Sequence, residues 1–99
     1  MATLLTASGE SRDVPGPLTL VQMQTQVGGW IELVTLRVER GARIALVVDD
    51  EGKLKGKPVN IAATALYHAA LPGVQDVIVG DALLVRVEHE GVTGQEAWR

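Results

Sequence analysis

The chain has 99 residues, of which 46% are hydrophobic, and this length suits one compact domain with its own core. It contains no cysteine, which excludes disulfides, thiolate zinc sites and a cysteine nucleophile. The formal net charge of −3 argues against general nucleic-acid binding, which draws on a basic surface, although it is compatible with a local basic patch.

Residues 2–7 (ATLLTA) predict an opening strand, because they are short and apolar and a polar segment follows them. That segment, residues 8–13 (SGESRD), is interpreted as a turn. The sequence Pro-Gly-Pro at residues 15–17 then ends any regular element.

A helix is predicted to begin after Leu18. Thr19 and Gln22 have the spacing of a capping box, and Leu18 and Met23 have that of a hydrophobic staple. One apolar stripe follows, formed by Leu20, Met23 and Val27. The glycine pair at residues 28–29 can end the helix in the left-handed conformation. The alternative is a strand over residues 18–23 (LTLVQM).

Residues 30–38 (WIELVTLRV) and 42–49 (ARIALVVD) predict two strands that form a β-hairpin. The continuous apolar run of the second strand indicates a central position that is covered on both faces. In the first strand, alternation places Trp30 and Glu32 on one face. Glu32 is either a carboxylate at the sheet margin that reaches water or an arginine, or a ligand-facing acid beside Trp30.

An acidic turn and a run of lysines follow the hairpin, at residues 49–57 (DDEGKLKGK). We expect Gly52 to adopt a positive φ in a tight turn, and the three acids before it to remain in water. In an extended conformation Lys53, Lys55 and Lys57 would point the same way. Their charges would then repel one another unless they were solvated or met an anion.

Asn60 predicts the N-cap of a second helix, which Pro72 and Gly73 end. Its expected buried face consists of Ile61, Ala65, Leu66 and Ala69. Because the N-terminus of a helix and neighbouring lysines both attract negative charge, this cap and the lysine run form the best candidate anion site in the chain. The competing interpretation is a solvated lysine loop.

Residues 74–79 and 82–88 are the last strand candidates. The Gly80-Asp81 pair between them either forms a two-residue hairpin turn, or residues 74–79 are only an extended approach to the last strand. We expect one α+β domain over residues 1–90, with a mostly antiparallel sheet of about four to five strands and two helices packed on it. Residues 91–99 predict a flexible tail, in which Trp98 is exposed or docked on a neighbour.

No motif for catalysis, for metal binding or for a cofactor is present. The sequence lacks a nucleophile elbow, a Walker loop, a dinucleotide-binding glycine loop and a zinc-binding helix, and His68 and His89 belong to no such motif. We therefore predict no catalytic residue, metal or cofactor, and an enzyme that uses Glu32, Asp81 or His68 is the least favoured class. Because no apolar run spans about 20 residues and no signal peptide is recognisable, we expect a cytoplasmic protein without a membrane partner.

Three motifs carry a resemblance to a known family: VGGWIE (residues 27–32), DDEGKLKGKPVNIAATAL (49–66) and DVIVGDALLV (76–85). In their order and spacing the chain resembles domain-of-unknown-function family 3846, a family of small proteins associated with phages and plasmids. The resemblance implies a viral or mobile-element setting and no established activity. It points to Gly28, Gly29, Trp30, Glu32, Glu51, Gly52, Lys53, Asn60, Thr64, Gly80 and Asp81.

These observations favour a non-enzymatic binding module, acting as a phage or mobile-element accessory such as a counter-defence protein. Its ligand would be a small anion such as a nucleotide, or a host protein. The candidate ligand-binding residues are Trp30, Glu32, Lys53, Lys55, Lys57, Asn60, Thr64 and Asp81. In this hypothesis the lysines and the amides near the cap hold the anion, Trp30 stacks on it and Glu32 is a polar anchor. The alternative is a structural protein that forms a homo-oligomer through a strand edge or through Trp98.

Overall fold

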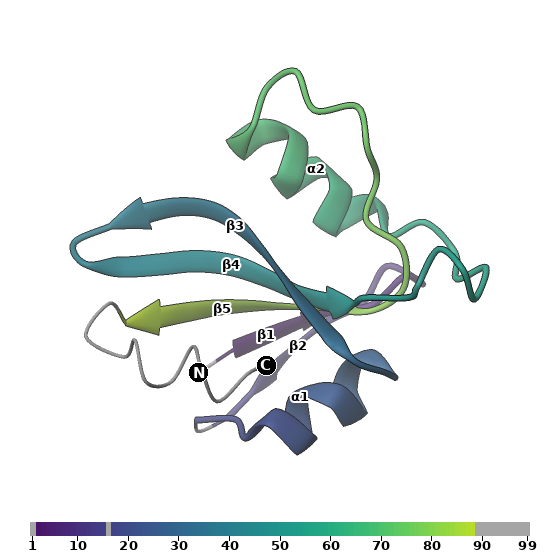
Figure 1. The fold of residues 1–99 in the computed structure, drawn as a ribbon, viewed down its shortest axis with the longest axis horizontal. Helices are drawn as coiled ribbons and strands as arrows, with labels where there is room; N and C mark the ends of the chain where they lie inside the picture. The colour runs from purple at the N-terminus through teal and green to yellow at the C-terminus, as the bar shows by residue number, and fades with distance from the viewer. Residues whose placement is uncertain (1, 16, 89–99) are drawn as a thin grey trace.

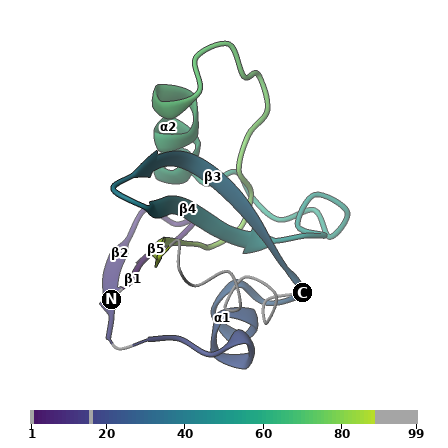
Figure 2. The same ribbon diagram turned by 60° about the vertical axis from the view of Figure 1, so that its left-hand side comes forward.

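The computed structural model describes residues 2–15 and 17–88, which form an antiparallel sheet with a helix on each face (Figure 1 and Figure 2). The strands are β1 (Ala2–Leu5), β2 (Ser11–Val14), β3 (Ile31–Glu39), β4 (Ala42–Asp49) and β5 (Ala82–Glu88), in the order β2-β1-β5-β4-β3. The helices are α1 (Leu20–Val27) and α2 (Ile61–Ala70). The expected α+β class, with five strands and two helices, is confirmed. Residues 91–99, with Trp98, and His89 lie outside the described residues.

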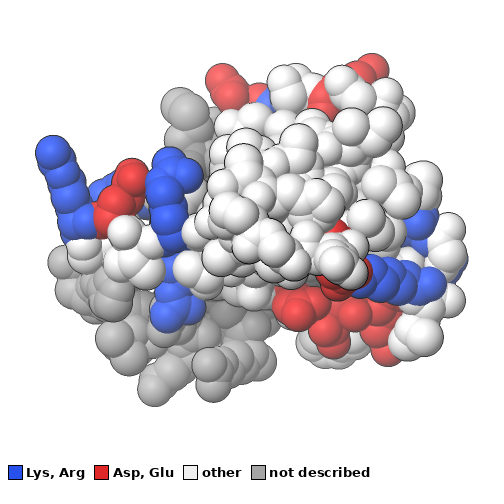
Figure 3. All heavy atoms as spheres, turned by 90° about the horizontal axis from the view of Figure 1, so that it is seen from above, with Lys and Arg blue, Asp and Glu red and all other residues white. Residues whose placement is uncertain are grey.

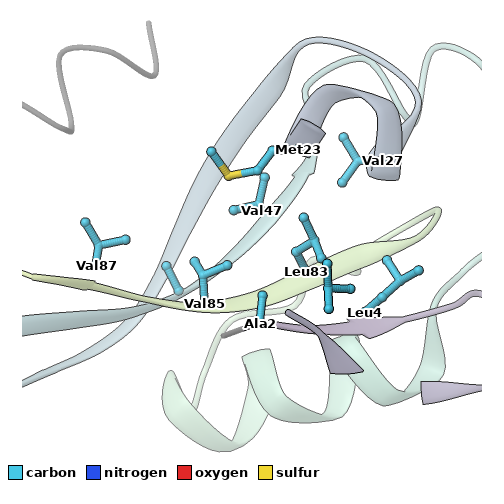
Figure 4. Close-up of a cluster of buried hydrophobic side chains, with 10 residues drawn as sticks. Ala2, Leu4, Met23, Val27, Val47, Leu83, Val85 and Val87 are labelled. Carbon is cyan, nitrogen blue, oxygen red and sulfur yellow. The ribbon is translucent and has the colours of Figure 1, made fainter. Parts of the chain in front are cut away.

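The strand β4 lies between β5 and β3 and is covered on both faces, as its apolar run predicted. Ala45 and Val47 belong to a core cluster on the α1 side, where Met23 and Val27 pack (Figure 4). Leu46 and Val48 alternate with them and belong to a second cluster under α2. Because successive side chains of a strand point to opposite faces, one strand supplies both halves of the core.

The helix α1 begins and ends as its sequence predicts. Thr19 Oγ1 accepts a hydrogen bond from Gln22 N at 3.1 Å, and Gln22 Oε1 accepts one from Thr19 N at 2.8 Å, which completes the capping box. Leu18 packs against the same cluster as Met23, as the staple requires. Gly28 ends the helix with a φ of 85°. The alternative of a strand over these residues is therefore wrong.

The predicted β-hairpin is formed by β3 and β4, joined by Arg40 and Gly41 with φ values of 51° and 74°. Two consecutive left-handed residues match the twist of the flanking strands. A β-bulge interrupts the pairing between Thr35 and Arg37, so that Leu36 has no partner on β4. Trp30 lies just before β3 and outside it.

The cap of α2 is confirmed, whereas its predicted buried face is wrong. Asn60 caps the helix, but Ile61 is 78% exposed, and Ala65, Leu66 and Ala69 are exposed as well. The residues that pack on the sheet are Ala63, Tyr67 and Ala70. Nearly every position of this alanine-rich helix is apolar, so its periodicity does not select a face.

The side chain of Asn60 fixes which face of α2 turns inward. It is fully buried, and its Oδ1 accepts a hydrogen bond from Ala63 N at 3.0 Å. Its amide nitrogen donates to Leu5 O at 2.8 Å and to Gly80 O at 2.9 Å. The residue therefore ties the start of α2 to β1 and to the segment before β5.

Two further predictions are corrected. Residues 8–13 were interpreted as a turn, yet Ser11–Val14 forms the edge strand β2, whose side chains are mostly exposed. Residues 74–79 form no strand and make only one bridge, between Val59 and Val79, so the alternative of an extended approach to β5 is confirmed and the Gly80-Asp81 hairpin is wrong. Among the described residues, no helix has the length and apolar character needed to cross a membrane.

Two replacements of Asn60 separate its role as the cap of α2 from its hydrogen bonds to Leu5 O and Gly80 O. Asn60→Ala should lower the free energy of unfolding by about 2–4 kcal/mol, because it removes the cap and leaves two buried carbonyls without a donor. Asn60→Asp keeps a capping oxygen but places a carboxylate against Leu5 O and Gly80 O, so it should also destabilise the fold. Urea unfolding of both variants measures this. If Asn60→Asp is as stable as the wild type, capping is the whole role of the residue.

Candidate functional site

Asp49, at the end of β4, is the charged residue around which the candidate site is built. We expected the three acids of this turn to remain in water, and Asp50 and Glu51 are exposed, but Asp49 is only 6% exposed. Its Oδ2 lies 2.8 Å from the ammonium nitrogens of both Lys55 and Lys57, and its Oδ1 accepts a hydrogen bond from Glu51 N at 2.9 Å. We call Asp49, Lys55 and Lys57 the Asp49 cluster.

The two lysines of the Asp49 cluster also bind the end of α1. Lys57 Nζ donates to Val27 O at 2.7 Å, and Lys55 Nζ donates to Gly28 O at 3.1 Å. Carbonyls at a helix C-terminus carry partial negative charge and lack partners within the helix, so ammonium groups stabilise them. The lysines thus serve the C-terminus of α1, and not the N-terminus of α2 to which the sequence pattern assigned them.

Residues 50–56 fold as successive turns, which place Lys53 apart from Lys55 and Lys57. Lys53 pairs with Asp76 at the surface, away from the Asp49 cluster. Every lysine of the run therefore already has a carboxylate partner. The like charges that the sequence places together are neutralised within the chain.

Glycines make room for the Asp49 cluster. A Cβ atom on Gly29 would lie 2.6 Å from Lys55 Nζ, and one on Gly28 would lie 2.9 Å from Lys57 Nζ. A Cβ on Gly80 would lie 2.8 Å from Lys57 Cδ. Gly52 does not have the positive φ that we expected; its role is close approach, since a Cβ there would lie 2.9 Å from Val79 Cγ2. The three motifs of the family resemblance therefore meet around this cluster.

The protonation of Asp49 is controlled by opposing effects. Burial, the largest single effect, raises the pKa of Asp49, but the hydrogen bonds from Lys55, Lys57 and Glu51 N and the charge of Lys57 together outweigh it and lower this pKa from 3.8 to about 2. At the surface, the hydrogen bond from Lys53 lowers the pKa of Asp76. Both carboxylates are therefore charged at neutral pH.

The remaining candidate residues are divided among three surface hollows. Trp30 is 69% exposed and lines a hollow of about 430 Å³ with Val21 and Lys55. Glu32 lies in a different hollow of about 310 Å³, between β3 and residues 76–79, together with Lys53. Asp81 belongs to a third. Trp30 and Glu32 therefore lie in different hollows and do not form one ligand site.

Other predicted site residues form hydrogen bonds inside the fold. Thr64 Oγ1 accepts from Ile78 N at 2.9 Å, and Asp81 Oδ1 accepts from Ala7 N at 3.0 Å. His68 is exposed, and its Nε2 lies 2.6 Å from Asp76 O. No two of Glu32, Asp81 and His68 lie in the same one of these three hollows. Residues 2–15 and 17–88 contain no group of three or more side chains that could hold a metal ion.

The sequence interpretation missed two carboxylates, Asp49 and Asp76. Asp49 could have been recognised from its place at the end of a fully buried strand, with lysines following closely in the chain. Asp76 carries no such signal, because its pairing with Lys53 depends on how two loops meet.

One family model matches the chain. It is described as Domain of unknown function (DUF3846), and it matches residues 3–96. No curated protein and no solved structure matches the chain.

The depressed pKa of Asp49 predicts acid lability. A group whose pKa is lower in the folded state contributes stability above its unfolded pKa of 3.8, and this contribution is lost as the pH falls towards about 2. The contribution is about 2 kcal/mol at pH 7. Unfolding free energies measured from neutral pH to pH 2 should therefore converge for the wild type and Asp49→Asn. A constant difference between them would contradict this origin.

The lysines should differ in their effect on stability. Lys57→Met leaves a buried carboxylate with one fewer partner and should lower the free energy of unfolding by about 1–3 kcal/mol. Lys53→Met removes an exposed pair and should change it by less than about 1 kcal/mol. Thermal and chemical denaturation of the two variants compare them directly. Equal losses of unfolding free energy would mean that the buried Asp49 cluster stabilises the fold no more than the exposed Lys53–Asp76 pair does.

Proposed function

The chain belongs to the family described as Domain of unknown function (DUF3846), a description without an activity, and we propose that it is a non-enzymatic module that binds a protein partner through the outward face of α2. We define the α2 face as Ile61, Ala62, Ala65, Leu66 and Ala69. The single observation that supports this proposal is that these apolar side chains are exposed to solvent, including the four that we expected to be buried, Ile61, Ala65, Leu66 and Ala69.

The composition of the α2 face indicates the chemistry of the partner. Ile61 is 78% exposed and Leu66 is 38% exposed, and α2 contains no Lys, Arg, Asp or Glu. Figure 3, which views the molecule from the α2 side, shows a broad area without charged side chains, which are visible around its margins. Exposed apolar side chains that gather on one helix, as Ile61 and Leu66 do here, are typical of a protein interaction site. The partner that fits it is a protein with an apolar, uncharged contact surface.

The charges of the described residues favour a protein over a small anion. Lys55 and Lys57 are held by Asp49 and by carbonyls of α1, and Lys53 is paired with Asp76. Releasing either inner lysine to an anion would leave the buried Asp49 carboxylate with one fewer partner, which is costly for a buried charge.

The cellular setting forms part of the proposal. We place the protein among the accessory proteins of a phage or mobile element, where a counter-defence protein would act by binding a host protein. The support for this setting is the order of the three family-like motifs, around residues 27–32, 49–66 and 76–85.

The experiment compares two glutamate substitutions at exposed apolar helix positions. A photo-crosslinker at Ala62 identifies the partner in host cells, and the purified partner is then titrated calorimetrically. Ile61→Glu should weaken binding by about tenfold or more, since it places a charge in an apolar contact, whereas Val21→Glu on α1 should bind as the wild type does.

Two results would contradict the proposal. The first is a partner that binds Ile61→Glu as tightly as the wild type. The second is a nucleotide that binds the wild type and binds Lys53→Ala more weakly. This result would favour an anion site at the lysine run over the α2 face. Lys53 is the lysine to test, because its replacement leaves Asp49 with both of its partners.

A further inference from the structure

The outer edge of β3 is a second interaction surface, separate from the α2 face. β3 ends the sheet in the described part of the chain, so one side of its backbone has no neighbouring strand there. The opposite edge of the sheet, β2, is short and mostly exposed, with the sequence SRDV, which is how proteins protect an edge against further pairing. β3 is more than twice as long and is rich in Val, Leu and Ile.

The backbone groups available on this edge follow from the pairing with β4. Asp50 N donates to Trp30 O, so Trp30 directs its backbone groups towards β4. Backbone groups alternate in direction along a strand, and those of Ile31, Leu33 and Thr35 therefore point away from β4. An added antiparallel strand would bond to these residues.

We propose that this edge pairs with β3 of a second copy of the chain, antiparallel and about a two-fold axis at Val34. Leu33 then lies opposite Thr35 of the other copy, and both residues direct their backbone groups to the shared edge. The two five-stranded sheets become one continuous sheet, and the same patch contacts itself, as a two-fold dimer requires.

The bulge of β3 brings opposite charges into register in this dimer. On the β4 side the pairing passes from Thr35 to Arg37 and skips Leu36. The same shift on the outer side places Arg37 opposite Glu32 of the other copy, and Val38 opposite Ile31. Glu32 is exposed, and its side chain forms no hydrogen bond or ion pair with another described residue, so in the dimer Arg37 of the other copy becomes its partner.

Arg37 can turn to the second copy without leaving an acid unpaired. It forms an exposed ion pair with Glu39 at 3.0 Å. Glu39 also lies 3.5 Å from Arg86, which would remain beside it. Exchanging one exposed pair for another costs little.

The two ends of the molecule are complementary in charge, and this dimer places them together. The β3–β4 turn lies at the left of Figure 1, and Lys and Arg side chains are visible at the left of Figure 3. Arg37 and Arg86 form ion pairs with Glu39 there, the charge of Arg40 acts on Glu39, and Arg43 is the partner of Val38 across the hairpin. Around the start of β3 there are five acids and three lysines: Glu32, Asp49, Asp50, Glu51, Asp76, Lys53, Lys55 and Lys57. Antiparallel pairing sets the basic end of each copy against the acidic end of the other, which favours association.

Charge exchange tests this interface. Sedimentation equilibrium of the full chain over a concentration series should give the mass of a dimer of 10.5 kDa chains for the wild type. Glu32→Arg and Arg37→Glu should each weaken the dimer by about tenfold or more, because each sets like charges opposite one another at two symmetric positions. The double variant should restore the dimer. Asp13→Arg, on the β2 edge, is the matched control and should leave it unchanged.

The outcomes decide the proposal. A wild type that is monomeric at the highest attainable concentration overturns it, and so do single variants that dimerise as the wild type does. Loss of the dimer in both single variants without recovery in the double variant rejects the Glu32–Arg37 register. Thermal melts of all variants show whether each is folded, and rescue by the second charge change cannot arise from unfolding.

Discussion

The buried, ionised carboxylate of Asp49 holds three segments of this fold together through its two lysine partners. Removing a carboxylate from water costs several kcal/mol unless opposite charges and hydrogen bonds replace the water. Here two ammonium groups and one backbone N–H do so, and both ammonium groups also bind the last carbonyls of α1. One group of side chains therefore joins the end of β4, the turns of residues 50–57 and the end of α1.

This arrangement changes the meaning of the lysine run. On the sequence alone, three closely spaced lysines before a helix cap suggest a site for an anion. In the structure the anion is a carboxylate of the chain itself, and the capped helix is anchored separately by Asn60. The recognition surfaces that we propose instead are the exposed apolar α2 face and the outer edge of β3.

Local patterns predicted the local features well. The capping box of Thr19 and Gln22, and the cap at Asn60, depend on residues within one turn of the chain, so the sequence contains all the information they need. The buried face of α2 cannot be predicted from local residues in this way. An alanine-rich helix offers several apolar faces, and Asn60 selects one of them through its hydrogen bonds to the carbonyls of Leu5 and Gly80. β2 was missed for a similar reason, since a polar edge strand lacks the apolar alternation by which strands are recognised.

The candidate site was predictable only in part. The three family-like motifs do meet in one place, around the Asp49 cluster. The glycines of these motifs leave room for lysine side chains and for Val79, and the spacing of residues in the sequence does not reveal this role. Asp49 remains charged although it is buried, because Lys55 and Lys57 neutralise it. A carbon-13 NMR titration of the Asp49 side-chain carboxyl measures this charge state. We predict a midpoint at a pH of about 2, and a midpoint near the ordinary value of 3.8 would show that the lysines do not hold the carboxylate in its charged form.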